Sequence, residues 1–393
     1  MDRSEQNKHQ NRVLRQKECK LHQFEVIFDS DKQYKAGEWV TGLVKVGVSE
    51  APLKNIEGIA LHYEGSAMTE WIEQEFNPRN LSGPGENYKT TRHVKYFARE
   101  TYFKEKIFIV EKDNRHNGQE YRLSLNIGKH VLPFKFQIPA ILLPQSYECK
   151  YGYIRYKVFA SIVRKRENDL TTQERLFTVL GSGTNVKANT KQGRTLRLPS
   201  TKVKETPEVC CWPWRTSVPI DASFQVDKRG CVPGETVFVS GSVGYFSRRT
   251  KPSVKISLQQ ITIARAKRDG KGGEHDKYIL KVLVEHTVEE SDGHAEVTFD
   301  RIPLTISPFC PPARVHAQDG CCIMDIVYCV KLEADVKGLG CFIHPIIIGS
   351  AFSSEKIPLD LAIVAPASNN SYRHEGLQSC GDMAWPVNVP FRT

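Results

Sequence analysis

The segment YGYIRYKVFASIV, Tyr151–Val163, decides the fold class. Every even-numbered residue from Ile154 to Ile162 is apolar, whereas Arg155 and Lys157 occupy odd-numbered positions between them. Successive side chains of a β-strand point to opposite faces of the sheet. The alternation therefore predicts a strand with one face in a core and the other face in solvent.

The same two-residue period recurs along the chain. Trp39–Val48 and Met324–Ala334 repeat it, and clusters of glycine, asparagine and serine separate the runs. No segment predicts an amphipathic helix longer than two turns. Val254–Ile263 changes parity partway, which predicts a β-bulge near Gln259–Gln260. These patterns indicate an all-β protein in which two sheets pack face to face in each domain.

Length and composition limit the organisation and the partners. A chain of 393 residues with 40% apolar and 25% charged residues is long enough for two folded domains of roughly 150 residues each. Its 55 lysines and arginines exceed 45 acidic residues by a formal charge of +10. This surplus favours anionic partners such as phospholipids or acidic peptides. Because no long basic run accompanies it, nucleic acid is not expected.

The cysteines and the apolar segments indicate a cytoplasmic setting. The eleven cysteines are odd in number and contain no Cys-x-x-Cys, so neither a disulfide framework nor a zinc site is expected. We expect them to be mostly buried thiols. Residues 1–20 are charged and unlike a signal peptide. No apolar stretch reaches the roughly 20 residues that span a bilayer. No metal or cofactor is expected.

Two halves of the chain carry similar turns. Tyr34–Glu38 reads YKAGE and Cys231–Glu235 reads CVPGE, and a valine-rich strand follows each turn. Proline fixes φ in such a turn, and glycine takes the position of positive φ. A second pair of matching places is Pro144 with Tyr156 and Pro308 with Tyr328. The correspondence predicts tandem sandwiches of similar plan.

Short motifs between about residues 21 and 351 form an ordered set. Those of the first half are Phe28-Asp29, Tyr34–Glu38, Gly128–Phe134, Ile138-Pro139, Leu143–Tyr147 and Gly152–Tyr156. Those of the second half are Cys210-Cys211, Pro219-Ile220, Gly230–Glu235, Ser247–Arg249 and Ile346–Gly349. In their order and spacing they resemble the α-arrestin family of arrestin domain-containing proteins.

The resemblance implies two tandem arrestin-like, immunoglobulin-like β-sandwich domains with a short C-terminal tail. The expected divisions are a charged segment at 1–20, the N-terminal domain at 21–185, a linker at 186–211, the C-terminal domain at 212–351 and the tail at 352–393.

For function, the resemblance implies a cytosolic adaptor that links membrane cargo to endocytic, sorting or ubiquitination machinery. Its expected partners are cargo tails, acidic phospholipids and ubiquitin ligases, and its expected location is the cytoplasm, with peripheral association at the plasma or endosomal membrane. Many α-arrestins recruit ligases through Pro-Pro-x-Tyr motifs, but Ala313 and Arg314 follow the single Pro-Pro pair here. The alternative is a stable coat-type subunit resembling the arrestin-like subunit of retromer.

Two basic clusters are candidate sites for an anion or a cargo tail, because guanidinium and ammonium groups suit phosphate and carboxylate. The first is Arg155, Lys157, Arg164, Lys165 and Arg166, and the second is Arg265, Lys267, Arg268 and Lys271. Neighbouring glycines predict that the second lies in a loop, where it could contact a membrane. The alternative for both is an ordinary solvated surface.

One further candidate concerns lipidation, and catalysis finds little support. Cys210 and Cys211 lie beside Trp212 and Trp214, which suits palmitoylation, although buried packing is the alternative. No catalytic motif or His-x-x-x-His spacing is present. We therefore predict a binding protein without enzymatic activity. An enzyme on an all-β sandwich is the alternative, and a deep pocket with perturbed titratable groups would favour it.

Overall fold

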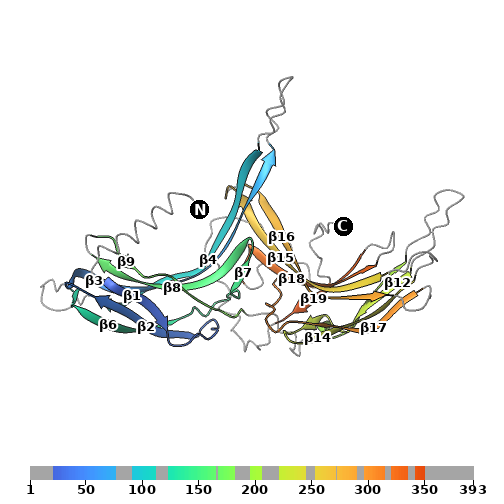
Figure 1. The fold of residues 1–393 in the computed structure, drawn as a ribbon, viewed down its shortest axis with the longest axis horizontal. Coiled ribbons are helices and arrows are strands. Elements are labelled where there is room, and N and C mark those ends of the chain that lie inside the picture. The colour runs from blue at the N-terminus through green and yellow to red at the C-terminus, as the bar shows by residue number, and fades with distance from the viewer. Residues whose placement is uncertain are drawn as a thin grey trace, which may run out of the picture. The chain divides into compact units, whose positions relative to one another are not determined.

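The computed structural model describes residues 21–76, 91–111, 123–164, 167–181, 195–205, 221–244, 253–270, 272–289, 296–314, 320–334 and 341–349. The regular elements in these ranges are β-strands (Figure 1). The all-β prediction is therefore confirmed.

The strands fall into two groups along the chain. The first group is β1 (Leu21–Phe28), β2 (Trp39–Val48), β3 (Leu53–Phe76), β4 (Thr91–Glu111), β5 (Leu123–Leu125), β6 (Gly128–Gln137), β7 (Tyr147–Cys149), β8 (Gly152–Arg164), β9 (Leu170–Thr171) and β10 (Arg175–Phe177). The second group is β11 (Ser200–Glu205), β12 (Asp221–Val226), β13 (Gly230–Cys231), β14 (Thr236–Gly244), β15 (Ser253–Arg268), β16 (Glu274–Glu289), β17 (Glu296–Thr305), β18 (Met324–Ala334) and β19 (Cys341–Ile348).

Each group forms a sandwich, and one large sheet belongs to both. In the first sandwich the three-stranded sheet β1-β2-β6 packs on the strands β10-β8-β3-β4. In the second, β11-β12-β14-β17 packs on β15, β18 and β19. Strand β4 pairs with β15 through Phe97–Lys267 and Tyr96–Arg268, so the two large layers join into a 12-stranded sheet.

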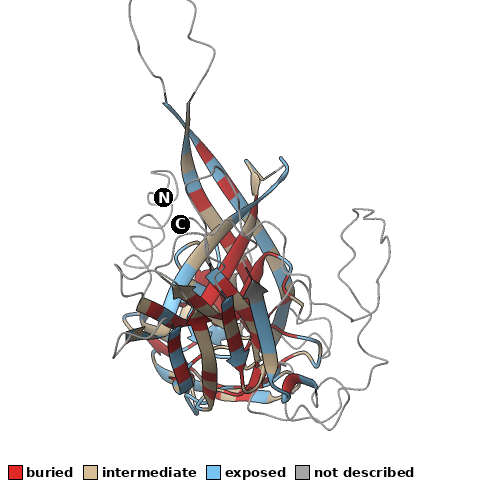
Figure 2. Ribbon diagram, turned by 90° about the vertical axis from the view of Figure 1, so that its right-hand side faces the viewer, coloured by how far each residue is buried: buried red, intermediate tan, exposed pale blue. Residues whose placement is uncertain are grey.

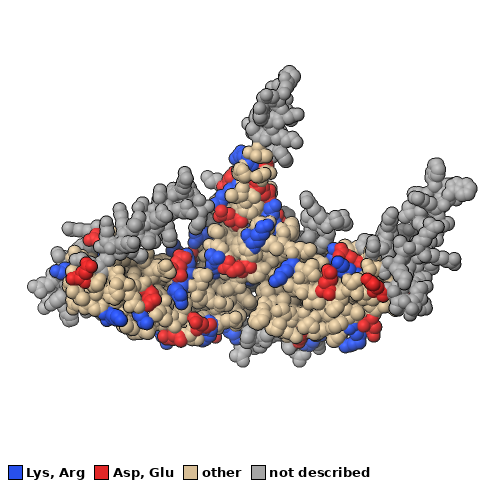
Figure 3. All heavy atoms as spheres, viewed as in Figure 1, with Lys and Arg blue, Asp and Glu red and all other residues tan. Residues whose placement is uncertain are grey.

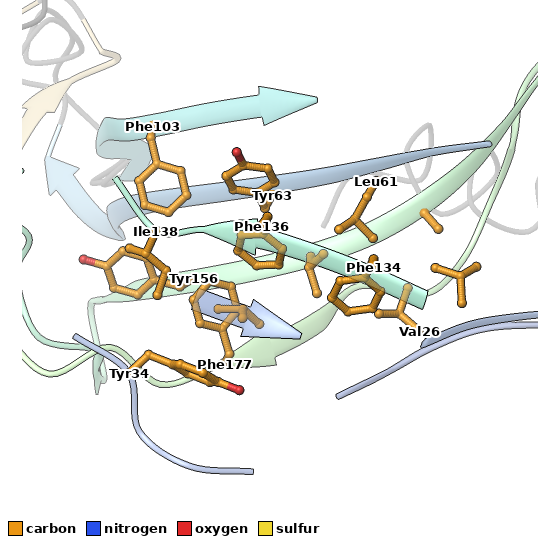
Figure 4. Packing of buried hydrophobic residues seen from close by; sticks show 14 of the residues in the cluster. Val26, Tyr34, Leu61, Tyr63, Phe103, Phe134, Phe136, Ile138, Tyr156 and Phe177 are labelled. Carbon is orange, nitrogen blue, oxygen red and sulfur yellow. The ribbon is translucent and has the colours of Figure 1, made fainter. Parts of the chain in front are cut away.

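Burial along β2 and β8 follows the alternation of the sequence, and buried positions alternate with intermediate ones on these strands (Figure 2). In the first core the rings of Tyr63 and Phe136 stack with centroids 4.2 Å apart. Phe177 meets Phe136 edge to face at 6.0 Å, and Phe134 lies beside it (Figure 4). Aromatic pairs of this kind stabilise a core by more than the burial of their apolar area alone.

The matching turns of the two halves make matching hydrogen bonds. Gly37 N–H donates to the Ile138 carbonyl at 3.0 Å, and Gly234 N–H donates to that of Ile306 at 3.0 Å. Both glycines have positive φ, 82° and 89°, as the turn requires. The two β-sandwiches therefore share a plan, as the repeated sequence predicts.

The segment expected to link the sandwiches contains a strand. β11 (Ser200–Glu205) pairs with β12 over its whole length, and Leu196 is buried against Val232. Residues 196 and 200–205 therefore belong to the second sandwich, which corrects this part of the expected linker at 186–211. The sequence does not predict this strand, because it has a single large apolar residue and so shows no alternation of apolar and polar positions. That residue, Val203, is 62% exposed.

The parity change in β15 coincides with a register shift in its pairing with β16. Leu258 pairs with Val284 and Gln259 with Val282, so the additional residue is Leu283 on β16. A bulge was predicted near Gln259–Gln260. The irregularity is at that place, but β15 itself pairs with β18 in unbroken register. Ile261 and Ile263 are apolar because their face of the sheet is also buried.

Candidate functional site

The first basic cluster lies on β8, and carboxylates accompany its described members. Arg155 donates two hydrogen bonds to the Glu148 carboxylate, at 2.6 and 2.9 Å. Lys157 Nζ lies 2.7 Å from Glu174 Oε1. Arg164 bonds to Glu167 and, at 3.0 Å, to the Asn168 carbonyl. The last two members of the cluster, Lys165 and Arg166, lie outside the described residues.

Two further lysines share the face of Arg155 and Lys157. Glu64 on β3 pairs with Lys157 on one side and with Lys104 of β4 on the other, and Lys106 is the next residue of that face. Lys104 and Lys106 are exposed, and the described residues offer neither of them an ion pair. Sequence reasoning missed both, although they alternate with Glu105 at strand spacing in KEK.

The charge at the centre of this face is a buried carboxylate. Glu64 is 5% exposed and accepts a hydrogen bond from Arg99 Nη2 at 2.7 Å. Five described cations lie around Glu64 on this face: Arg99, Lys104, Lys106, Arg155 and Lys157. Its three carboxylates are Glu64, Glu148 and Glu174. We call this set the β8 face, and it carries a positive surplus that an anion could neutralise.

The described members of the second basic cluster lie on a strand and not in a loop, which corrects the prediction made from the neighbouring glycines. Arg265, Lys267 and Arg268 lie on β15, and Lys267 and Arg268 are at the place where that strand pairs with β4. Arg268 Nη2 bonds to Glu75 of β3 at 2.7 Å. Lys267 and Arg268 therefore help to join the two sandwiches. Lys271 lies outside the described residues.

Arg265 is half-buried and forms an ion pair with a buried carboxylate. It donates to the carboxylate of Asp325, whose side chain is 4% exposed, and lies 3.8 Å from Asp276. Burial opposes the charge of the guanidinium, but the hydrogen bond to Asp325 and the two carboxylates outweigh burial and raise its pKa. Arg265 is therefore committed to the interior of the second sandwich.

Side chains of both sandwiches meet in a set of specific hydrogen bonds. Tyr147 of β7 bonds through its hydroxyl to Thr262 at 2.8 Å and accepts from Gln260 at 2.9 Å. The carboxylate of Glu100 on β4 accepts the backbone N–H of Cys322, with both oxygens 3.1 Å from the nitrogen. Burial raises the pKa of this carboxyl. None of these contacts could be anticipated, because they join residues far apart in the sequence.

A pocket of about 600 Å³ lies where these sandwiches meet. Tyr147 and Arg155 from the first sandwich line it together with Gln260 and Lys281 from the second. Phe309 also lines it, and its side chain is 93% exposed. Lysine and arginine lie among acidic residues over the face of the molecule seen in Figure 3.

The described residues do not form a recognisable catalytic or metal site. His62 Nε2 lies 2.8 Å from Ser161 Oγ, but Ser161 is 1% exposed, so a substrate could not reach it. Burial raises the pKa of the Cys231 and Cys329 thiols to about 12, which disfavours the reactive thiolate. No group of three or more histidine, cysteine, aspartate or glutamate side chains suits a metal ion in the part of the chain that is described.

Two further sequence predictions concern lipid. Cys210 and Cys211 lie outside the described residues, so the palmitoylation site stays a prediction. Within the described ranges, no helix has the length and apolar character needed to cross a bilayer.

Comparison with known proteins shows the family. Residues 24–184 match the N-terminal domain of arrestin, or S-antigen, and residues 216–351 match the C-terminal domain. The chain is 30% identical to arrestin domain-containing protein 17 of Caenorhabditis elegans over 84% of its own length and 71% of that protein. It is 25% identical to human arrestin domain-containing protein 4 over 80% of its length and 67% of the relative. With both arrestin domains present in order on two sandwiches of shared plan, the chain belongs to the arrestin domain-containing protein family.

Proposed function

We propose that this chain is a non-enzymatic adaptor in protein trafficking, the general role that its arrestin domains support, and that its β8 face recognises acidic or phosphorylated tails of membrane cargo. The observation that carries the proposal is the pair Lys104 and Lys106, two exposed cations beside Lys157 on one sheet face. A sheet face of this kind can accept an extended anionic chain.

The carboxylates of the β8 face determine how this face would bind a phosphate. Glu148 and Glu174 are 58% and 54% exposed, so their ion pairs with Arg155 and Lys157 are screened and contribute little to stability. An incoming phosphate can replace them at small cost and gains charge-assisted bonds to the same cations. Lys267 and Lys271 would supply a second, weaker contact with acidic phospholipid. Two weak contacts on one protein gain through effective concentration.

Further partners follow from the expected role of the chain. Recruitment of a ubiquitin ligase would use a route other than Pro-Pro-x-Tyr, because the sequence has no such motif. Acylation of Cys210 or Cys211 would add membrane affinity, and labelling that hydroxylamine removes is its direct assay. The location proposed is the cytoplasm, with peripheral binding to the plasma or endosomal membrane.

The test is fluorescence anisotropy with an acidic peptide that carries two phosphoserines, compared with its unphosphorylated form. The double variant Lys104→Glu/Lys106→Glu should weaken phosphopeptide binding about tenfold, the equivalent of about 1.4 kcal/mol. The matched control is Lys54→Glu/Lys129→Glu, which makes the same charge change at exposed positions of the first sandwich. Equal affinities for the two variants would refute the β8 face as the binding site.

A further inference from the structure

The strand β16 (Glu274–Glu289) has one free edge. It pairs with β15 over residues Lys267 to Ser253, and with no other strand among the described residues. No other backbone hydrogen bond reaches it within that part of the chain. A strand of this length leaves a row of N–H and C=O groups on its outer side, and such a row is a template for another strand.

The centre of this edge carries a single charge, whereas exposed strands are usually protected by several. Tyr278–Val284 reads YILKVLV and contains one charged residue, Lys281. Leu280 and Val282, which share one face, are 54% and 46% exposed. Natural edge strands usually carry several charges, a proline or a short length to prevent pairing. The apolar edge of β16 is therefore suited to pairing with a partner.

The other face of the same segment looks into the pocket where the sandwiches meet. Ile279 and Lys281 line this pocket, together with Phe309 and Leu176. Phe309 is 93% and Leu176 is 55% exposed, so the rim offers apolar surface next to the strand edge. Side chains on one face of an added strand would thus pack on Leu280 and Val282, and those on its other face would enter the pocket.

The charge of the pocket indicates which side chain would enter it. Its charged lining residues are Lys150, Arg155, Lys281 and Glu148, with three cations and one carboxylate. Glu148 already binds Arg155, and Lys281 has no ion pair in the described part of the chain. Two neighbouring lysines differ, since Lys277 pairs with Glu73 at 2.5 Å and Lys255 with Glu285 at 3.2 Å. An acidic side chain would complete the pair that Lys281 lacks.

We propose that the free edge of β16 binds an extended peptide segment of a partner protein by strand addition. Apolar side chains of that segment pack on Leu280 and Val282, and an acidic side chain on its other face pairs with Lys281. Main-chain hydrogen bonds supply affinity in this mode of recognition, and the alternating side chains supply specificity. The inference rests on the proposed adaptor function and names where a second, unphosphorylated partner segment would bind.

The test uses an acetylated and amidated nine-residue peptide, TVTVEVTVT, whose central glutamate shares a face with its threonines. Fluorescence anisotropy should show binding to the full chain, and the variant Lys281→Glu should weaken it about tenfold, as expected for loss of one charge-assisted pair. A peptide with lysine in place of glutamate should bind Lys281→Glu better than the unaltered protein. Failure of this charge exchange would overturn the assignment of Lys281.

Backbone pairing is tested separately. N-methylation of alternate peptide amides along one edge should abolish binding, whereas methylation of the amides along the other edge should leave it intact. If both methylated peptides bind equally, the peptide does not add to a sheet. The variant Leu280→Lys/Val282→Lys should also lose binding, and Lys129→Glu on β6 is the charge control.

Two outcomes separate this inference from its rivals. Sedimentation of the protein without peptide should give a monomer. A dimer that Leu280→Lys/Val282→Lys dissociates would mean that a second copy of the chain occupies the edge, which would overturn the proposal. Lys104→Glu/Lys106→Glu should leave TVTVEVTVT binding unchanged, so the β8 face and the β16 edge can fail independently.

Discussion

The hydroxyl of Tyr156 donates a hydrogen bond to the carbonyl of Pro144 at 2.6 Å, between a buried strand and the loop before it. Tyr328 makes the equivalent bond to Pro311 at 2.6 Å in the second sandwich. Both tyrosines are at most 1% exposed. Tyr156→Phe should therefore lower the free energy of unfolding by about 1–3 kcal/mol, because a buried carbonyl loses its partner. Tyr328→Phe should do the same, and urea denaturation measures both. A loss below about 0.5 kcal/mol would mean that water satisfies these carbonyls.

Gly65 on β3 lies where the neighbouring rings leave no room for a side chain. A Cβ there would lie 2.7 Å from ring atoms of both Phe103 and Tyr156. Gly65→Ala should destabilise the protein by about 1–3 kcal/mol through overpacking. Gly273→Ala is the control, since its Cβ would meet no atom within 4 Å. Thermal unfolding of the two variants compares them, and equal midpoints would contradict the packing argument.

The sequence alone predicted the strands and the duplicated plan, because period-two burial and turn chemistry are local properties. It could not reveal which charges pair. Arg265 and Lys104 are both cations, yet Arg265 is half-buried against the buried carboxylate of Asp325 and Lys104 is exposed on the β8 face. That difference depends on which strand crosses which, and hence on contacts between distant residues. The free edge of β16 was equally hidden, since YILKVLV reads like a buried strand.

Removing one partner of the Arg265–Asp325 pair should lower the free energy of unfolding, whereas replacing both partners with apolar residues should change it little. Asp325→Asn leaves the guanidinium of Arg265 half-buried, with Asp276 at 3.8 Å as a remaining carboxylate. We expect a loss of about 2 kcal/mol, because a half-buried charge loses its hydrogen-bonded partner. The double variant Arg265→Met/Asp325→Leu should recover most of this stability. Urea denaturation of the single and double variants is the measurement, and additive losses would contradict the coupling.

His344 should make the second sandwich sensitive to acid. It is 1% exposed, and its Nε2 lies 3.3 Å from the Phe224 carbonyl. Burial lowers its pKa from 6.5 to about 4, so the unfolded chain binds the proton more tightly. Stability should therefore fall as the pH drops from about 6.5 through about 4, by up to about 3 kcal/mol.

His344→Gln isolates this contribution, because glutamine can still donate to the Phe224 carbonyl and does not titrate. The midpoint of thermal unfolding should fall less between pH 7 and pH 4.5 in the variant than in the unaltered protein. Carboxylates of the rest of the chain contribute equally to both. Parallel curves for the two proteins would show that burial does not lower the pKa of His344.

Glu100 should have the opposite pH dependence. Burial raises the pKa of its carboxyl above the ordinary 4.5, although the N–H of Cys322 partly compensates by favouring the charged form. The folded protein therefore binds the proton more tightly, and stability falls as the pH rises through the interval above 4.5. Glu100→Gln keeps an acceptor for the Cys322 N–H without the buried charge. The variant should be at least as stable as the unaltered protein at pH 7.5, and its advantage should disappear near pH 4.5.

Glu105→Gln, at an exposed position of the same strand, is the control in thermal unfolding. If Glu100→Gln is instead destabilised most at pH 7.5, the ionised carboxylate is needed to join β4 to Cys322, and the hydrogen bond outweighs the cost of burial.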